Sequence, residues 1–201
     1  MTTPGASHDT DRSFRRRLMD LVEGISPWDD QERGHVAVVA EWITRGSPLH
    51  RVRKPDVPDQ HLVCYFVVLD EAHEQLLLVA HRKAGLWLPS GGHVEPGEEP
   101  WDTVVRECRE ELRIGARPSA LSGTRPFFLT VTRTRGAGEH TDVSLWYLLQ
   151  ADPDDITSFD SGEFETVRWF PLRQVLTTPV DTLDPHMHRF TRKLLAAVPT
   201  G

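Results

Sequence analysis

The feature that most constrains the fold is a series of β-rich apolar runs that begins at His61 and is interrupted by one helical pattern. The runs have the lengths of strands and are separated by turn residues; they are "HLVCYFVVLD", "EQLLLVAHR", "GLWLPSGGHV", "PFFLTVTRT", "DVSLWYLLQA" and "TVRWFP". The third run is a short strand that leads into a Gly-rich loop, and a helix is predicted after it over Trp101–Leu112. Strands interleaved with helices, some joined by hairpin-length turns, predict an α/β (α+β) fold with a mixed sheet flanked by helices.

Other helices are predicted at both ends of the chain. Apolar residues recur at helical spacing from Phe14 to Val22 and again from Val36 to Ile43. Ser26-Pro27 has the N-cap and N1 residues expected at the start of the second of these helices, and Gly46 is suited to its end. A last helix is expected to begin near Asp184-Pro185 and to run to about Ala197.

A proline-punctuated linker, "RKPDVPDQ" at Arg53–Gln60, is the best candidate for a domain boundary. We therefore divide the chain into an N-terminal helical extension over residues 1–57 and a second domain over residues 58–201. Met1–Thr10 is small and polar, and we expect it to be disordered.

Charge and composition exclude some classes of function. The net charge of −7 argues against a nucleic-acid binder that works through a broad basic face. The longest apolar runs, such as Leu62–Leu69, are too short to span a bilayer, and the N-terminus has no apolar segment of the signal-peptide type. Cys64 and Cys108 lie in apolar patterns and are expected to be buried free thiols, which fits a reducing cytoplasm.

The helix predicted at Trp101–Leu112 has an apolar face and an acidic face. Its apolar residues have the spacing of a helix packed on a core; they are Trp101, Val104, Val105, Cys108 and Leu112. Glu107, Glu110 and Glu111 share the neighbouring face, where each like-charge pair costs on the order of 0.2–0.5 kcal/mol. Arg106 can relieve part of this repulsion through Glu110, its i+4 partner.

Two interpretations of the acidic face are open at this point. Charged helix faces are usually only solvated surface. Here, however, the carboxylates cluster on one side of the helix and adjoin Gly91-Gly92, whose backbone can approach a ligand closely. Another acid, Glu98, precedes the helix, and hard divalent cations such as Mg²⁺ prefer oxygen ligands of this kind.

The segment Gly92–Ile114 resembles the Nudix box, G-x5-E-x7-R-E-U-x-E-E-x-G-U, in which U is an apolar residue. Gly92, Glu98 and the run "RECREELRI" occupy its positions, and Arg113 stands where the box usually has Gly. That Gly normally ends the helix, and Gly115 could take over this role. The resemblance extends over about His61–Phe170 and the last helix, and it implies an α/β/α sandwich of the Nudix type.

The resemblance implies a hydrolase that breaks a phosphoanhydride bond of a nucleoside diphosphate linked to another group. Mg²⁺ or Mn²⁺ would be held by Glu107, Glu110 and Glu111, with Glu98 nearby and a backbone carbonyl of the Gly91-Gly92 loop completing the shell. Bound metal would neutralise the phosphate charge and activate water. Arg106 would orient the helix carboxylates.

The general base is left open between Glu107 and Glu163, an acid in the loop before "RWFP". Glu165 is the fallback and Asp160 a weaker alternative. The expected catalytic residues are thus Glu107, Glu110, Arg106 and Glu163.

Several residues outside the box are candidates for substrate binding. Arg82 matches a position where relatives often contact phosphate, and Arg can bind phosphate in a bidentate manner. Tyr65 and Trp87 could stack on a nucleobase, although aromatic residues in strands are more often core. His140 and Asp142 flank the start of a strand and could face the site. His186 and His188 are separated by only two residues on an expected helix and cannot share a face, so we reject a zinc site there.

Alternative functions remain. The first is a Nudix-fold module that binds a nucleotide without cleaving it, although this box retains all its acids. The second is a prenyl-diphosphate isomerase, which needs a catalytic Cys that neither cysteine offers. The expected partner is a nucleotide-type small molecule, with no nucleic acid and no membrane. The N-terminal helices could form a homodimer interface or a lid over the pocket.

Overall fold

The computed structural model describes residues 4–53, 57–72, 74–134 and 139–197, and the side chains of these residues from Thr10 onward. Within them lies a sheet of seven strands: β1 (Gln60–Asp70), β2 (Gln75–His81), β3 (Leu86–Leu88), β4 (Ser90–His93), β5 (Phe128–Arg133), β6 (Thr141–Gln150) and β7 (Phe164–Pro171). The helices are α1 (Pro4–Glu23), α2 (Asp30–Thr44), α3 (Pro100–Glu111), α4 (Leu172–Val175) and α5 (Met187–Ala197), with short 3-10 turns at Pro153–Asp155 and Val180–Thr182.

The sheet is mixed, as predicted. Its main path runs β3-β2-β1-β6-β5, with β4 paired to β1 and β7 paired to β2. The pair β1 and β6 is parallel, with Gln60 opposite Thr141 and His61 opposite Asp142. The other strand pairs are antiparallel. The long central strands β1 and β6 thus begin at the same end of the sheet.

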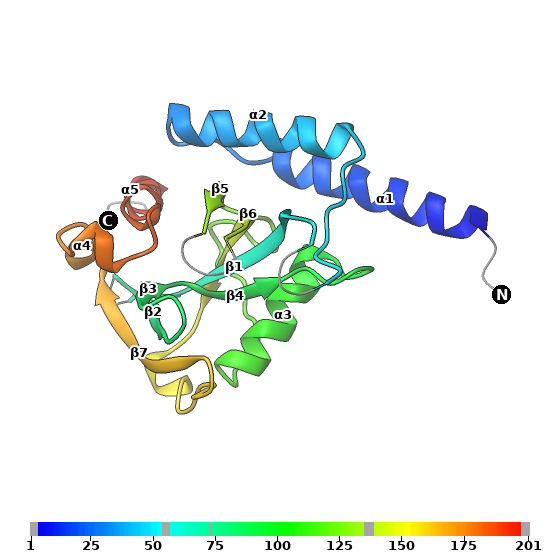
Figure 1. The fold of residues 1–201 in the computed structure, drawn as a ribbon. Helices are drawn as coiled ribbons and strands as arrows, with labels where there is room; N and C mark the ends of the chain where they lie inside the picture. The colour runs from blue at the N-terminus through cyan, green and yellow to red at the C-terminus, as the bar shows by residue number, and fades with distance from the viewer. Residues whose placement is uncertain (1–3, 54–56, 73, 135–138, 198–201) are drawn as a thin grey trace.

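Helices cover both faces of this sheet (Figure 1). Leu62, Cys64 and Phe66 of β1 pack in one core with residues of α1, α2 and α3. Val67 and Leu69, whose side chains point the other way, pack in a second core with α4 and α5. This arrangement confirms the predicted α/β/α sandwich.

The apolar face of α3 is buried as its spacing predicts. Val104, Cys108 and Leu112 are 0% exposed and belong to the first core. Both cysteines of the chain are buried free thiols, as expected. The helix ends at Glu111, and Arg113 follows with a φ of 58°. The suggestion that Gly115 replaces the missing Gly is wrong, because Arg113 itself adopts the left-handed conformation and Gly115 does not.

The starts of two other helices differ from the predictions. Helix α1 begins at Pro4, inside the segment expected to be disordered. Helix α2 is capped by Asp29 rather than Ser26, because the Asp29 carboxylate accepts a hydrogen bond from the Glu32 backbone N–H at 2.8 Å. Gly46 ends this helix with a φ of 72°, as predicted.

Gly91-Gly92 lies in a strand and not in a loop. Both glycines belong to β4, where Gly91 is opposite Tyr65 and Gly92 is opposite Cys64 of β1. The strand brings the start of the acidic motif directly against the centre of the sheet. Among the described residues, no helix combines the length and the apolarity that crossing a membrane requires.

Candidate active site

A cavity of about 780 Å³ lies where β1, β4 and α3 meet the loops that precede β6 and β7. Its walls are formed mainly by polar and charged side chains from segments distant in sequence; they include Arg51, Tyr65, Arg82, Lys83, His93, Glu95, Glu107, Glu111, His140, Asp142 and Glu163. This volume is within the range of small-molecule sites.

Glu107 reaches the cavity only because residue 92 is a glycine. A Cβ atom on Gly92 would lie 1.9 Å from Oε1 of Glu107, well inside van der Waals contact. Burial raises the pKa of the Glu107 carboxyl, and the nearby charges of Glu110 and Glu163 raise it further, against the lowering effect of Arg106. The close approach of strand β4 to α3 therefore places the largely buried Glu107 carboxylate beside the backbone of Gly92.

Arg106 links the acids of the motif to one another. Its guanidinium donates to Glu98 at 2.8 and 3.0 Å, to Glu107 at 2.6 Å and to Glu110 at 3.4 Å. It also donates to the His93 carbonyl of β4 at 3.1 Å. One side chain therefore holds the carboxylates in place and ties α3 to the strand beside it.

Glu111 is the most deeply buried acid of the motif. Its Oε2 accepts hydrogen bonds from Ser90 Oγ at 2.5 Å and from the Gly91 N–H at 2.9 Å. Burial raises the pKa of the Glu111 carboxyl to about 8, although these hydrogen bonds act in the opposite direction. The negative charges of Glu107 and Glu163 contribute to this increase, which indicates that the three carboxylates are close enough to repel one another.

Two predicted metal ligands do not line the cavity. Glu110 is exposed on α3, with 60% of its side chain accessible, and pairs with Arg106. Glu98 binds Arg106 and also accepts from the Thr103 hydroxyl at 2.7 Å. The geometry gives Glu98 a role in holding Arg106, and Glu110 lies on the exposed side of the same guanidinium.

The loop before β7 brings Glu163 to the cavity. The Asp160 N–H donates to the Glu111 carbonyl at 2.7 Å, and the Arg82 N–H donates to the Glu163 carbonyl at 2.9 Å. These bonds fix both ends of the loop against α3 and the end of β2. Glu165 and Asp160, the alternatives to Glu163, are not among the lining residues.

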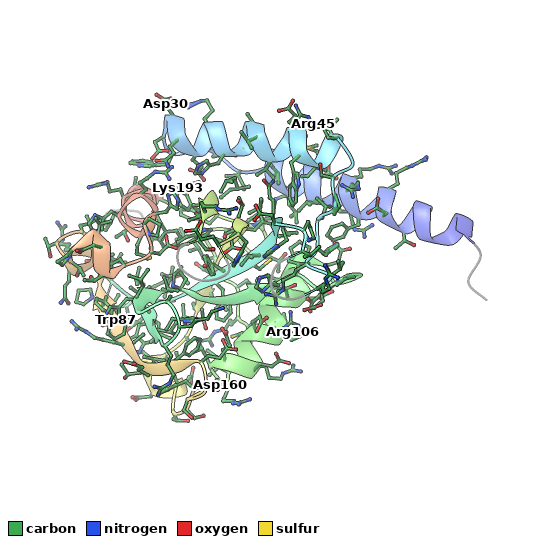
Figure 2. The ribbon with its side chains drawn as sticks, in the orientation of Figure 1. Asp30, Arg45, Trp87, Arg106, Asp160 and Lys193 are labelled. Carbon is green, nitrogen blue, oxygen red and sulfur yellow. The ribbon has the colours of Figure 1, made fainter. Side chains whose placement is uncertain are left out.

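Of the residues predicted to bind substrate, Trp87 alone is not among those that line the cavity, whereas Arg82, Tyr65, His140 and Asp142 are. Trp87 packs against Phe170, with ring centroids 5.1 Å apart, in the second core. Figure 2 shows it near the end of the molecule formed by β3, apart from Arg106 on α3. We therefore do not include Trp87 in the proposed site.

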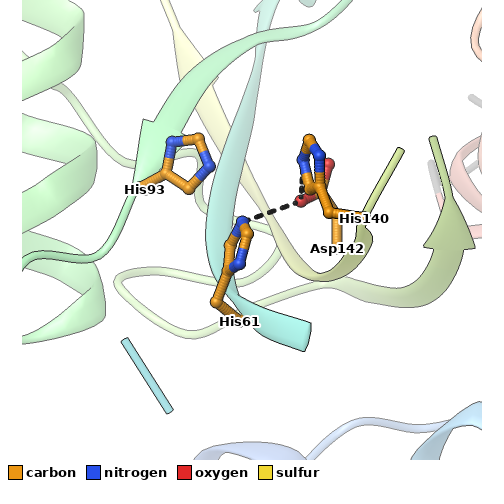
Figure 3. A group of neighbouring side chains, drawn as sticks. All are labelled: His61, His93, His140 and Asp142. Carbon is orange, nitrogen blue, oxygen red and sulfur yellow. Dashed lines mark ion pairs between the residues drawn. The ribbon is translucent and has the colours of Figure 1, made fainter. Parts of the chain in front are cut away.

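The structure adds two histidines that the sequence analysis did not select. His61 and His93 join His140 and Asp142 in one group, whose ligand-type atoms all lie within 4.8 Å of one another (Figure 3). A His-x-Asp pair at a strand start places both side chains on one face, which was a usable signal. No sequence pattern near His140 and Asp142 linked this pair to His61 or His93.

The charges in this group are set by its surroundings. Burial alone would raise the pKa of Asp142, but its contacts with His140 and His61 outweigh burial and lower the pKa to about 2. Burial, together with the charge of Arg51, lowers the pKa of His93 to about 4. Asp142 is therefore ionised and His93 neutral at pH 7.

The carboxylates of the motif suit a hard divalent cation. Glu107 and Glu111 present oxygen atoms to the same cavity, and strand β4 has no Cβ at Gly92 to block the approach. Magnesium and manganese prefer such oxygen donors. The residues present therefore fit the metal that the motif implies.

Comparisons with known proteins give one family. A family model described as NUDIX domain matches residues 59–194. The uncharacterized Nudix hydrolase YvcI of Bacillus subtilis is 28% identical over 125 residues, which is 61% of this chain and 75% of that protein. The asymmetrical bis(5'-nucleosyl)-tetraphosphatase of Caenorhabditis elegans is 29% identical over 103 residues, 51% of this chain and 71% of that protein. In fold, the MutT protein of Methanosarcina mazei Go1 aligns with a TM-score of 0.55 at 20% identity, covering 68% of this chain and 94% of that one.

Proposed function

The chain belongs to the Nudix hydrolase family, and from this premise we propose that it is a Mg²⁺-dependent pyrophosphohydrolase of nucleoside polyphosphates. The observation that carries the proposal is the convergence of Glu107, Glu111 and Glu163 on one cavity that also contains Arg82. A nucleoside polyphosphate offers the phosphate charge that Arg82 and a metal would neutralise. The relative named as a dinucleoside tetraphosphatase supports this substrate class.

Glu107, Glu110 and Glu111 would hold Mg²⁺, or Mn²⁺, with a backbone carbonyl at Gly92. When bound, the metal neutralises phosphate charge and lowers the pKa of a coordinated water. Arg106 keeps Glu107 oriented through the 2.6 Å hydrogen bond. Holding the ligands in this way before the substrate arrives reduces the reorganisation needed in the transition state.

The other cavity residues act on the substrate and on the attacking water. Arg82 lies at the cavity wall beside the Glu163 loop and would contact a phosphate group. Tyr65 would stack on the base. Glu107 and Glu163 both remain candidates for the group that accepts the water proton, because both are carboxylates on the same cavity.

The test is an assay of hydrolysis over a panel of nucleoside triphosphates, nucleotide sugars and dinucleoside polyphosphates in the presence of Mg²⁺. The released phosphate or pyrophosphate is measured. For the best substrate, Glu107→Gln and Glu110→Gln should each lower kcat/KM by about 10² or more. Asp102→Asn removes another exposed acid from the first turn of α3 and should retain wild-type activity.

Two outcomes contradict the proposal. Wild-type turnover in both glutamine variants would show that the acidic face of α3 does not hold the metal. A wild-type chain that binds nucleotides but cleaves none of the panel would favour a binding module.

The pH profile of Glu163→Gln separates the two candidates for the general base, because loss of the base removes the acid limb of the pH dependence of kcat/KM. The cytoplasmic location and the homodimer remain predictions.

A further inference from the structure

A second group of metal-ligand type lies in the same cavity, away from the acidic motif. It consists of His61 from β1, His93 from β4, His140 from the segment before β6, and Asp142 from β6. The parallel register of β1 and β6 places His61 opposite Asp142, and the antiparallel register of β1 and β4 places His93 opposite Val63. All four side chains therefore project from the same face of the sheet, at the end where β1 and β6 begin (Figure 3).

The ring of His61 is oriented with a lone pair toward Asp142. Its Nδ1 lies 2.9 Å from the Pro58 carbonyl oxygen, which can only accept, so Nδ1 is the donor. In the neutral ring, Nε2 is then an acceptor, and it lies 3.4 Å from Oδ1 of Asp142, also an acceptor. Two acceptors at this distance repel unless a proton on Nε2 or a metal ion lies between them. A histidine that donates its other ring N–H to a carbonyl is the usual arrangement of a metal ligand.

Several polar atoms of the group are buried and lack a hydrogen-bond partner among the described residues. These atoms are Nε2 of His61, Nε2 of His93 and Oδ1 of Asp142. The His61 side chain is 0% exposed. Buried polar atoms are rarely left unpaired, so three of them facing one another point to a ligand.

The distances fit a four-coordinate ion. Bonds of 2.0–2.1 Å in a tetrahedron separate neighbouring ligand atoms by about 3.3 Å. Oδ1 of Asp142 is 3.4 Å from Nε2 of His61 and 3.1 Å from Nε2 of His140. Since all four ligand-type atoms lie within 4.8 Å, the longest separation must shorten by at most about 1.5 Å.

We propose that His61, His93, His140 and Asp142 form a binding site for a transition-metal ion of the Zn²⁺ type. Three imidazoles and one carboxylate favour zinc over magnesium, which seldom accepts nitrogen ligands. The site is distinct from the carboxylates of Glu107 and Glu111, which suit a hard cation. Because His93 and His140 line the cavity, an ion held there would add positive charge to the wall that faces the substrate. This inference does not depend on hydrolysis by the chain.

The direct test uses Co²⁺ as a spectroscopic probe for Zn²⁺ on the full chain. Titration is carried out with excess Mg²⁺, which keeps Co²⁺ from the carboxylates of the box. We expect one equivalent of Co²⁺ to bind with the strong visible absorption of a four-coordinate site, and one equivalent of Zn²⁺ to displace it. Zn²⁺ should also raise Tm, since an ion that binds only the folded state stabilises it.

Two ligand variants and two controls locate the site. His61→Asn retains a donor for the Pro58 carbonyl but removes the Nε2 ligand, and Asp142→Asn removes the charge with little change in shape. Each should weaken Co²⁺ binding at least about tenfold. His188→Gln, at a histidine whose Nε2 contacts the Thr178 carbonyl, should bind Co²⁺ like wild type. Glu107→Gln should lose hydrolysis but keep the Co²⁺ signal.

The outcomes decide the proposal separately from the enzymatic one. A folded wild-type chain that shows neither the Co²⁺ absorption nor a Zn²⁺-dependent increase in Tm overturns it, and the group is then an internal ion pair. A signal that persists in Asp142→Asn but is lost in Glu107→Gln also overturns it. If His61→Asn fails to fold by circular dichroism, Asp142→Asn and the Tm of the wild-type chain still decide the question.

Discussion

Arg113 occupies a backbone position that favours glycine. Its φ of 58° lies in the left-handed region, directly after the last turn of α3. A side chain at such a position costs roughly 1–2 kcal/mol because Cβ approaches a backbone carbonyl. The motif resemblance pointed to this residue as the one departure from the usual pattern, and the structure shows that the helix end keeps the usual geometry in spite of it.

Arg113→Gly should therefore stabilise the protein. Relief of the left-handed strain exceeds the added flexibility of glycine in the unfolded chain, so we expect a gain of about 0.5–1 kcal/mol in the free energy of unfolding. Urea denaturation measures it. Arg109→Gly, at an exposed position inside the same helix, is the matched control and should cost about 1 kcal/mol. Equal losses for both variants would contradict the assignment.

Glu111 makes stability depend on pH. Burial raises the pKa of its carboxyl from the ordinary 4.5 to about 8. The folded state therefore holds the proton more tightly than the unfolded state, and this contribution is fully present below pH 4.5 and is lost as pH rises through about 8. Ionised Glu111 without a metal is a buried carboxylate with only two hydrogen bonds.

Glu111→Gln should match the wild type at pH 5 and exceed its stability at pH 9 when divalent ions are chelated. The difference at pH 9 should be about 1 kcal/mol or more, since each unit of pKa corresponds to about 1.4 kcal/mol. Adding Mg²⁺ should stabilise the wild type alone. Urea denaturation at the two pH values checks this, and a difference that does not change with pH would argue against it.

At the scale of elements, α2 satisfies the open edge of the sheet. Strand β5 is an edge strand in the main path, and the Leu129 N–H donates to Glu32 at 3.3 Å while the Val131 N–H donates to His35 at 3.3 Å. The helix side chains thus replace a neighbouring strand. Covering an edge in this way prevents pairing with another chain.

The same helix is joined to α5 by a buried ion pair. Glu32 is 0% exposed and lies 2.8 Å from Nζ of Lys193, which Figure 2 shows on α5 below α2. The Glu32 carboxylate also accepts from the Trp28 N–H at 2.6 Å. Asp29 and Arg189 form a second pair between these elements, and the hydrogen bond from Arg189 lowers the pKa of Asp29 to about 2.

Glu32→Gln should lower the free energy of unfolding by about 3 kcal/mol, because it leaves the Lys193 ammonium buried without its partner. The double variant Glu32→Gln with Lys193→Met should recover much of this loss. Arg33→Gln, which breaks an exposed ion pair with Asp30 on the same helix, should cost less than about 1 kcal/mol. Similar losses for Glu32→Gln and Arg33→Gln in thermal or urea unfolding would contradict the buried pair.

At the scale of the whole molecule, the N-terminal helices share a core with the Nudix fold. Phe14, Leu18 and Val22 of α1 and Trp42 of α2 belong to the same buried cluster as α3. The division of the chain at residue 57 remains a proposal, as do the roles of these helices as a lid or a dimer interface. Their packing on the sheet gives them a structural role in any case.

The sequence by itself determined the local features of this protein. Strand lengths, the buried face of α3 and the acidic motif all follow from patterns within a few turns or residues, because side-chain periodicity and helix geometry are local. The start of α2 was predicted less well, because a capping hydrogen bond accepted by Asp29 decided it.

The tertiary structure decided what long-range register brings together. His61 and Asp142 are 81 positions apart in the chain and meet only because β1 and β6 are parallel with these residues opposite each other. The sequence predicted a loop at Gly91 and Gly92, whereas their pairing with β1 makes them part of a strand. Strand order and register depend on the burial of both sheet faces at once, and no segment carries that information alone. For this reason the acidic motif was visible in the sequence, whereas the histidine group was not.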